Sequence, residues 1–149
     1  MILLVLIVVA VLALGAWVRL APSDPSVWHT DPGVAAPTTG HYVVRPEGGD
    51  TAGPLLTGTP AEALAAFDAL ARATLRTTVL AGSVEEGRIT YVTRSALWGF
   101  PDYTTVEAVA MDEGTRLILH ARLRFGGSDM GVNAARVELW LQQLADQTS

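Results

Sequence analysis

The hydrophobic pattern of the chain begins with a long apolar run at the N-terminus. Residues 1–18 read MILLVLIVVAVLALGAWV and contain no charged side chain. As a helix this run covers about 27 Å, close to the thickness of the hydrocarbon core of a bilayer. Trp17 and Arg19 stand where an interfacial aromatic residue and a cation would stabilise the exit from the membrane. The pattern therefore predicts a single-pass transmembrane anchor over residues 1–20.

A cleaved signal peptide is the alternative interpretation of the same run. However, no basic residue precedes the apolar stretch, and the stretch is long for the core of a signal peptide. We therefore expect the anchor to be retained. By analogy with short N-terminal signal anchors, we expect it in the bacterial inner membrane, with the rest of the chain on the periplasmic side.

Residues 21–58 have a different composition, rich in Pro, Gly, Ser, Thr and Asp. Prolines recur between positions 22 and 37 and would interrupt a long helix. The composition predicts a tether with one short strand at His41–Arg45, not part of a core. Trp28 within this tether would either contact lipid headgroups or a partner, or pack on its own domain.

Regular periodicity starts at residue 59. Thr59-Pro60-Ala61-Glu62 combines an N-cap, a proline at the first helical position and the glutamate of a capping box, so a helix should run to about Thr74. Four β-branched segments follow, and then a stretch with apolar residues three and four positions apart. The predicted strands are 76–81, 88–97, 104–111 and 116–125; the predicted final helix is 130–143, burying Met130, Ala134, Val137, Leu141 and Leu144. This order predicts an α+β domain over residues 59–149, with a small antiparallel four- to five-stranded sheet and two helices packed on one face.

Basic and apolar residues alternate along the last predicted strand. The apolar positions from Leu117 to Phe125 should face the core, and the basic positions should face the other way. We identify a candidate partner surface on that second face, formed by Arg94, His120, Arg122 and Arg124. Arginines arranged in this way bind an anionic headgroup, a phosphate or an acidic protein surface. The alternative is a solvated sheet face whose arginines pair with acids such as Glu107.

The most distinctive stretch is RFGGSDMGVNAARV, residues 124–137, where the last strand leads into the final helix. Two adjacent glycines allow a tight turn, and Ser128 or Asp129 can cap the helix. Gly131 and Asn133 are poor helix formers, which suggests a packing or binding reason for them. Glycines at a helix N-terminus can also bind an anion. Asp129 already places a carboxylate there, so a structural role is favoured.

Several positions in this stretch match a known family signature. They are Arg124, Gly126, Ser128, Asp129, Gly131, Val132, Asn133 and Arg136. They resemble the C-terminal signature R-V-G-x-S-D-x-G-V-N-x-x-R-I of the family called domain of unknown function 1499. Upstream, Phe100-Pro101-Asp102 and Val106-Glu107 resemble the family's F-x-D-D-V-E segment. The family's P-N-C-V-S segment has no counterpart here, and Ala121 and Leu123 replace its serines. Because the family is uncharacterised, the resemblance implies a fold and structural roles for the motif residues, and it implies no activity.

Composition and spacing narrow the functional classes. The net charge is −5, which does not suit a nucleic-acid-binding domain, and there is no cysteine to act as a nucleophile or metal ligand. His29, His41 and His120 lack metal-ligand spacing, and no serine lies in a nucleophile elbow. We therefore expect no enzyme activity, no metal and no cofactor. A hydrolase that uses Ser128 or Asp129 is the weakest alternative.

Together these patterns predict a non-catalytic, membrane-anchored accessory or interaction subunit of a larger membrane protein complex. Its expected partners are the lipid bilayer and other membrane protein subunits. The alternative is a lipid- or apolar-anion-binding module of the cell envelope. Such a module would hold its ligand between the sheet and the helices.

Overall fold

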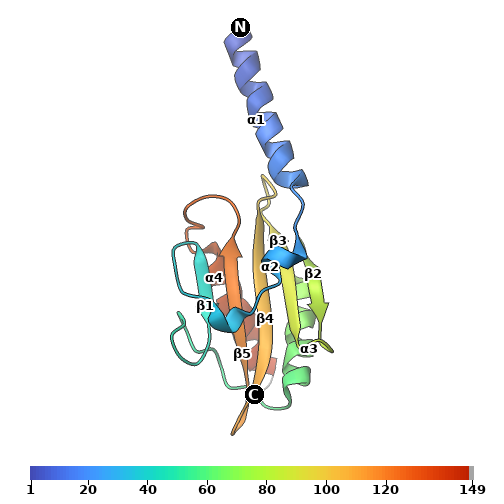
Figure 1. Ribbon diagram of the computed structural model, residues 1–149, viewed down its shortest axis with the longest axis vertical. Coiled ribbons are helices and arrows are strands. Elements are labelled where there is room, and N and C mark those ends of the chain that lie inside the picture. Colours follow the sequence, from blue (N-terminus) through green and yellow to red (C-terminus); the bar gives the residue numbers. More distant parts are fainter. Residues whose placement is uncertain (148–149) are drawn as a thin grey trace.

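The computed structural model describes residues 1–147 and confirms the predicted α+β architecture. One five-stranded antiparallel sheet has the strand order β1-β5-β4-β3-β2. Two helices cover one of its faces, and a third extends away from one end of the domain (Figure 1). The strands are β1 (His41–Val44), β2 (Thr77–Ser83), β3 (Arg88–Arg94), β4 (Pro101–Met111) and β5 (Gly114–Leu123); the long helices are α1 (Ile2–Leu20), α3 (Pro60–Ala73) and α4 (Val132–Gln147).

Helix α3 begins as its sequence predicts. The Thr59 side chain accepts a hydrogen bond from the Glu62 N–H at 3.3 Å, and the Glu62 carboxylate accepts one from the Thr59 N–H at 2.8 Å. This reciprocal pair satisfies two backbone donors that a helix start otherwise leaves free. The helix then buries Leu64, Phe67 and Ala71 against the sheet.

The core lies between the sheet and helices α3 and α4. Phe67 is central to it, with its ring 5.4 Å from the Trp140 ring and 6.0 Å from the Tyr91 ring, centroid to centroid. The Trp140 Nε1–H donates to the Thr74 hydroxyl at 2.7 Å, so the indole is buried without losing its hydrogen bond. Leu117, which alternation assigned to the core face, is buried here as expected. Side chains therefore fill the space between the sheet and the helices.

The final helix differs from its prediction at the N-terminal end. It begins at Val132, and Met130 precedes it with φ 53° and a side chain that is 92% exposed. The prediction that Met130 is buried is therefore wrong. Asn133 and Trp140 are buried on the inner face of α4 instead. The last two residues of the predicted domain, 148 and 149, lie outside the described residues.

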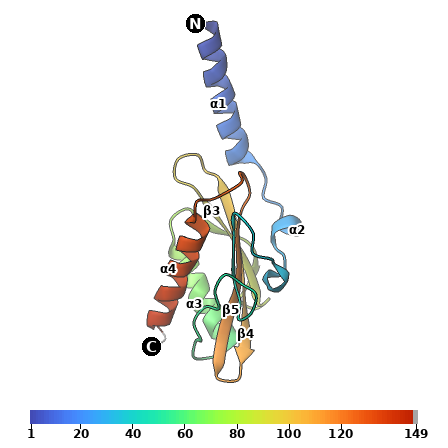
Figure 2. The same ribbon diagram turned by 90° about the vertical axis from the view of Figure 1, so that its left-hand side faces the viewer.

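Residues 21–58 are not a free tether. The segment forms a short helix α2 (Pro25–Trp28) and a 3-10 helix η1 (Pro32–Val34), which lie on the sheet face opposite α3 and α4 (Figures 1 and 2). Val43 and Leu56 are at most 1% exposed. The domain therefore has three layers: the two helices, the sheet, and this N-terminal segment. The predicted boundary at residue 58 divides residues that pack together.

Helix α1 stands apart from these layers. It is long and apolar enough to cross a membrane, and almost all of its side chains are exposed along its length. It is the one such helix within residues 1–147. Its C-terminal end adjoins the domain, and its N-terminal end points away from it (Figure 1).

Candidate functional site

The corner between β5 and α4 is held together by its own short polar side chains. The Asp129 carboxylate accepts hydrogen bonds from the N–H groups of Gly131 at 3.2 Å and Asn133 at 2.7 Å. The Ser128 hydroxyl accepts one from the Met130 N–H at 3.1 Å. Burial alone would raise the pKa of Asp129, but these N–H groups outweigh it and hold the pKa below its ordinary value. Asp129 therefore caps α4, as the sequence suggested, whereas Ser128 bonds within the loop before the helix.

Two glycines of the motif, Gly126 and Gly131, adopt backbone conformations that favour glycine. Gly131 has φ 82° directly after Met130 at φ 53°, so two consecutive residues adopt the left-handed conformation. A glycine adopts it without the steric cost of a Cβ atom. Gly126 has φ 98° for the same kind of sharp turn. The loop is shaped so that Asp129 reaches the first turn of α4.

Asn133 and Arg136 project from α4 toward the end of β4. The Arg136 guanidinium donates to the Asn133 side-chain oxygen and lies 3.9 Å from the Asp102 carboxylate. The Arg136 Cζ atom lies over the Trp140 ring, 5.7 Å from the ring centroid. Asp102 comes from the upstream motif segment and Arg136 from the C-terminal one. The structure therefore brings the two motif segments into one cluster.

This cluster is mostly buried, and its hydrogen bonding is incomplete. Burial raises the pKa of Asp102 to about 6, although the Arg136 charge opposes the rise and Asp129 adds to it. The Asn133 side-chain amide nitrogen and the Arg136 Nε are buried without a hydrogen-bond partner in the protein. Buried polar atoms usually have a partner, so groups like these are typical of sites that bind water or a polar ligand.

Two hollows open on either side of Asp102. The first, with a volume of about 480 Å³, is lined on its polar side by Arg76, Thr93 and Arg136. The second, about 420 Å³, is largely apolar; its apolar lining comes from Phe100, Leu123, Phe125, Met130 and Val132. Asp102, Ser95 and Val132 line both hollows. A cationic hollow and an apolar one therefore share one wall.

Comparison with protein families identifies the chain. The family model described as "Protein of unknown function (DUF1499)" matches residues 24–144. The chain belongs to this family. No curated protein matches it. The crystal structure of protein MLL2253 from Mesorhizobium loti is similar over 49% of this chain and 60% of that one, with 18% identity and a TM-score of 0.37. This chain thus spans less than two thirds of that protein, and the likeness is too low to support an argument.

The family match begins at residue 24, within the segment that covers the outer face of the sheet. Here the Trp28 ring stacks on the Tyr103 ring, with centroids 3.9 Å apart and planes 12° apart. The Trp28 carbonyl oxygen accepts hydrogen bonds from the Arg122 guanidinium and the Thr105 hydroxyl. His29 Nδ1 lies 2.9 Å from the Thr90 hydroxyl. The N-terminal part of this DUF1499 domain is therefore bonded to β3, β4 and β5.

Two of the arginines expected on an open face, Arg122 and Arg124, contact this N-terminal segment. Arg122 lies over the Trp28 ring, 5.0 Å from its centroid, and Arg124 donates to the Pro22 carbonyl oxygen at 2.8 Å. Arg94 donates to the Gly99 carbonyl oxygen at 2.9 Å. The predicted partner surface is thus largely covered by the chain's own N-terminal segment.

His120, the fourth member of that predicted surface, is 6% exposed and forms a pair with His41. His120 Nε2 lies 2.9 Å from His41 Nδ1, so one ring donates and the other accepts. Burial, Arg122 and His41 together lower the pKa of His120 to about 3. His120 is therefore neutral near pH 7, and burial also lowers the pKa of His41. Within residues 1–147, no group of three His, Asp or Glu side chains is placed to hold a metal ion.

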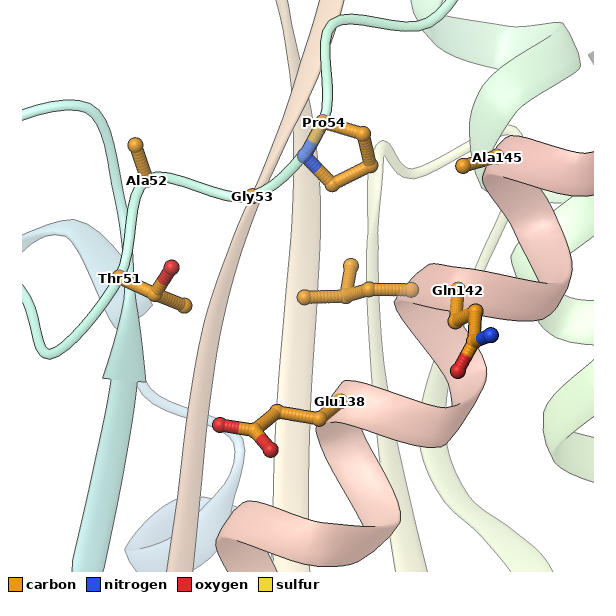
Figure 3. Close-up of a pocket in the computed structure, with 8 residues that line it drawn as sticks. Thr51, Ala52, Gly53, Pro54, Glu138, Gln142 and Ala145 are labelled. Carbon is orange, nitrogen blue, oxygen red and sulfur yellow. The ribbon is translucent and has the colours of Figure 1, made fainter. Parts of the chain in front are cut away.

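Another hollow, about 410 Å³, lies between residues 51–54 and α4 (Figure 3). Figure 3 shows that Thr51 and Pro54 come from the loop, and Glu138 and Gln142 from the helix. The Glu138 carboxylate already accepts a hydrogen bond from the Tyr42 hydroxyl at 2.7 Å. This hollow is therefore a weaker candidate than the pair at Asp102.

The site at Asp102 lies at the end of the domain that α1 adjoins. The Trp17 ring of α1 packs edge-on against Phe125, with centroids 5.3 Å apart. The Trp98 ring lies against Gly15, where an added Cβ would be 3.3 Å from it. The end of the anchor and the loops beside the two hollows therefore form one contact region.

Sequence reasoning missed Asp102 as part of the site and Tyr103 as the residue on which Trp28 stacks. The resemblance already contained a signal for Asp102, because this residue lies in the upstream motif segment and Arg136 in the downstream one. Two segments of one family signature often meet in the fold, so Asp102 and Arg136 could have been expected to lie close together. Tyr103 carried no comparable signal, because nothing local to it indicates Trp28.

Proposed function

We propose that this protein is a non-catalytic, membrane-anchored accessory or interaction subunit of a larger membrane protein complex. We place it in the bacterial inner membrane, with α1 as a retained single-pass anchor and the domain on the periplasmic side. The observation that carries the proposal is the packing of α1 on its own domain through Trp17 and Phe125. Anchor and domain would meet a partner as one unit, because this contact leaves little freedom between them.

The anchor offers a surface for such a partner. Small residues at Ala10, Ala13 and Ala16 alternate with bulky ones along α1, and small residues allow close helix–helix approach in lipid. Gly15 already contacts Trp98 of the same chain, whereas Ala10 and Ala13 are exposed. A transmembrane helix of another subunit would pack on this second part of the helix surface.

The test is extraction of the tagged full-length protein from its own membranes in a mild detergent, followed by native sizing and mass spectrometry. The variant Ala10→Leu/Ala13→Leu would fill the small-residue face and release the partner. The matched control Leu4→Val/Val8→Leu changes the opposite side of α1 and preserves its composition, so it would retain the partner. Recovery of the wild-type protein alone, at its own mass, would contradict the proposal.

A lipid- or apolar-anion-binding module is the second candidate function. It is favoured by the two hollows that share Asp102, since one presents arginines and the other apolar side chains next to the anchor. An anionic headgroup would occupy the hollow at Arg76 and Arg136, and an acyl chain would lie against Phe100 and Phe125. The ligand would lie at this end of the domain, because side chains fill the space between the sheet and the helices.

Native mass spectrometry of the protein released from nanodiscs of phosphatidylglycerol and phosphatidylethanolamine tests this candidate. The expected result is a retained anionic phospholipid in the wild-type protein and its loss in Arg76→Gln. Arg72→Gln on the exposed side of α3 removes the same charge elsewhere and should not change retention. Equal retention by the two variants would exclude the hollow as the binding site.

A further inference from the structure

Two loops at the α1 end of the domain carry large apolar side chains that are exposed. They are residues 95–100, between β3 and β4, and residues 124–131, between β5 and α4. Leu97 is 78% exposed and Met130 is 92% exposed, and Trp98 is 43% exposed although it contacts α1. Both loops reach toward α1 at the same end of the sheet (Figures 1 and 2).

The contacts with α1 fix how far these loops reach along the anchor. Trp98 lies beside Gly15, which precedes the end of α1 at Leu20 by about 7.5 Å of helix. The apolar run that ends at Val18 is barely long enough to cross a bilayer core of about 30 Å. Gly15 must then lie within the apolar part of the membrane or at its edge. A loop that touches Gly15 reaches the same depth.

The chemistry of the loop tips suits that depth. Tryptophan is enriched at the membrane–water interface, where its apolar ring and its N–H are both accommodated. Leucine and methionine gain free energy when their exposed surface leaves water. Arg19 lies beside this first loop, since an added Cβ at Gly99 would be 2.9 Å from its Cγ atom. A guanidinium at this level can reach lipid phosphates.

We propose that the loops 95–100 and 124–131 insert their apolar tips into the lipid interface beside α1. The domain then rests on the bilayer at three points, the anchor and two loops, with its sheet held at a fixed orientation to the membrane. The proposal commits to lipid as the occupant, because the loops continue the surface of a membrane-spanning helix. It rests on α1 being a membrane span, as the proposed function requires.

Single-cysteine labelling tests this proposal in the full-length chain, which contains no cysteine of its own. Leu97→Cys and Met130→Cys report on the two loops, and Val9→Cys reports on the middle of α1. Asp112→Cys is the control at the opposite end of β4, about 33 Å away along the strand. Each variant is placed in a nanodisc of phosphatidylglycerol and phosphatidylethanolamine and reacted with a charged, water-soluble maleimide. Reaction of the same variants in SDS corrects for differences in intrinsic reactivity.

The expected result is that both loop cysteines react about tenfold or more slowly than Asp112→Cys, since an interfacial side chain meets little water. A fluorophore on either loop should also be quenched by brominated lipid, whereas one at position 112 should not. Fast labelling of both loops with Val9→Cys protected would overturn the proposal and leave the anchor intact. Labelling of Val9→Cys as well would overturn the membrane span, and with it the proposed function. Protection without lipid quenching would identify another protein, or a second copy, as the occupant and also overturn the proposal.

Discussion

Removing the indole of Trp28 tests whether the N-terminal segment is part of the folded domain. The substitution Trp28→Ala leaves the backbone of α2 in place, including the Trp28 carbonyl group that accepts from Arg122 and Thr105. It deletes the ring that stacks on Tyr103 and lies under the Arg122 guanidinium. The change therefore isolates the ring contacts from the backbone hydrogen bonds.

The structure indicates the size of the effect. A stacked aromatic pair contributes about 1 kcal/mol beyond its buried area, and a guanidinium over an indole contributes about 1 kcal/mol when partly buried. The half-buried ring adds about 1 to 2 kcal/mol through the apolar surface that it removes from water. We expect Trp28→Ala to lower the free energy of unfolding by about 3 kcal/mol, since these terms act together. Trp28→Phe keeps a ring on Tyr103 and should lose about half as much.

The assay is urea unfolding of the full-length protein in a mild detergent, followed by far-UV circular dichroism. That signal reports backbone structure, so the loss of one tryptophan does not distort it. Leu139→Ala is the control, because it removes a large apolar side chain that is 53% exposed on the outer side of α4. It should change stability by less than about 0.5 kcal/mol. If Trp28→Ala changed stability as little as this control, residues 21–34 would not be an integral layer of the domain.

Three further predictions concern the polar groups. Burial raises the pKa of Asp102 to about 6, so the folded state binds a proton on this carboxyl more tightly than the unfolded chain. The resulting contribution to the free energy of unfolding is present below about pH 4. It is lost as the pH rises through 6, by about 2 to 3 kcal/mol. Urea unfolding between about pH 4 and pH 7 should show that Asp102→Asn lacks this decline, and a decline equal to that of the wild type would refute the assignment. The pKa of His120 is lowered to about 3, so the folded state resists protonation of this ring. The contribution of the neutral ring to the free energy of unfolding is complete above about pH 6.5 and is lost as the pH falls toward 3. His120→Gln can still bond to His41, and its urea midpoint should fall less than that of the wild type between pH 7 and pH 5; an equal fall would exclude His120 as the source. Asp129→Ala removes the acceptor for two backbone N–H groups and should lower the free energy of unfolding, measured by thermal denaturation, by about 1 to 2 kcal/mol. Asp129→Asn should recover part of this loss.

The parts of the fold that the sequence predicts depend on interactions between near neighbours. The capping box at Thr59 and Glu62 involves residues three positions apart, and strand alternation around Leu117 depends on period two alone. The same local logic identified Asp129 as a cap. A few consecutive residues are enough to indicate such features, so the helices and the strands were predictable.

The remaining features depend on contacts between distant residues. The Trp28 carbonyl bonds to Thr105, 77 positions away, and neither residue carries a pattern that indicates the other. Alternation places Arg122 on the outer face but does not say whether another layer covers that face. A proline-rich composition looks the same in a free linker and in a segment that packs without regular structure. For this reason the third layer was not predicted, and the basic surface was expected to be open.

The position of β1 has a consequence for how the domain is made. His41 and His120 pair across β1 and β5, although they lie 79 positions apart and β5 is the last strand in the sequence. Chains are synthesised from the N-terminus, so β1 and the segment before it leave the ribosome long before their partners exist. Closing a loop of this length is slow, and under the proposed function the anchor would already be in the membrane by then. The outer layer would therefore complete last. A chain that stops before β5 would keep β1 without the strand with which it pairs.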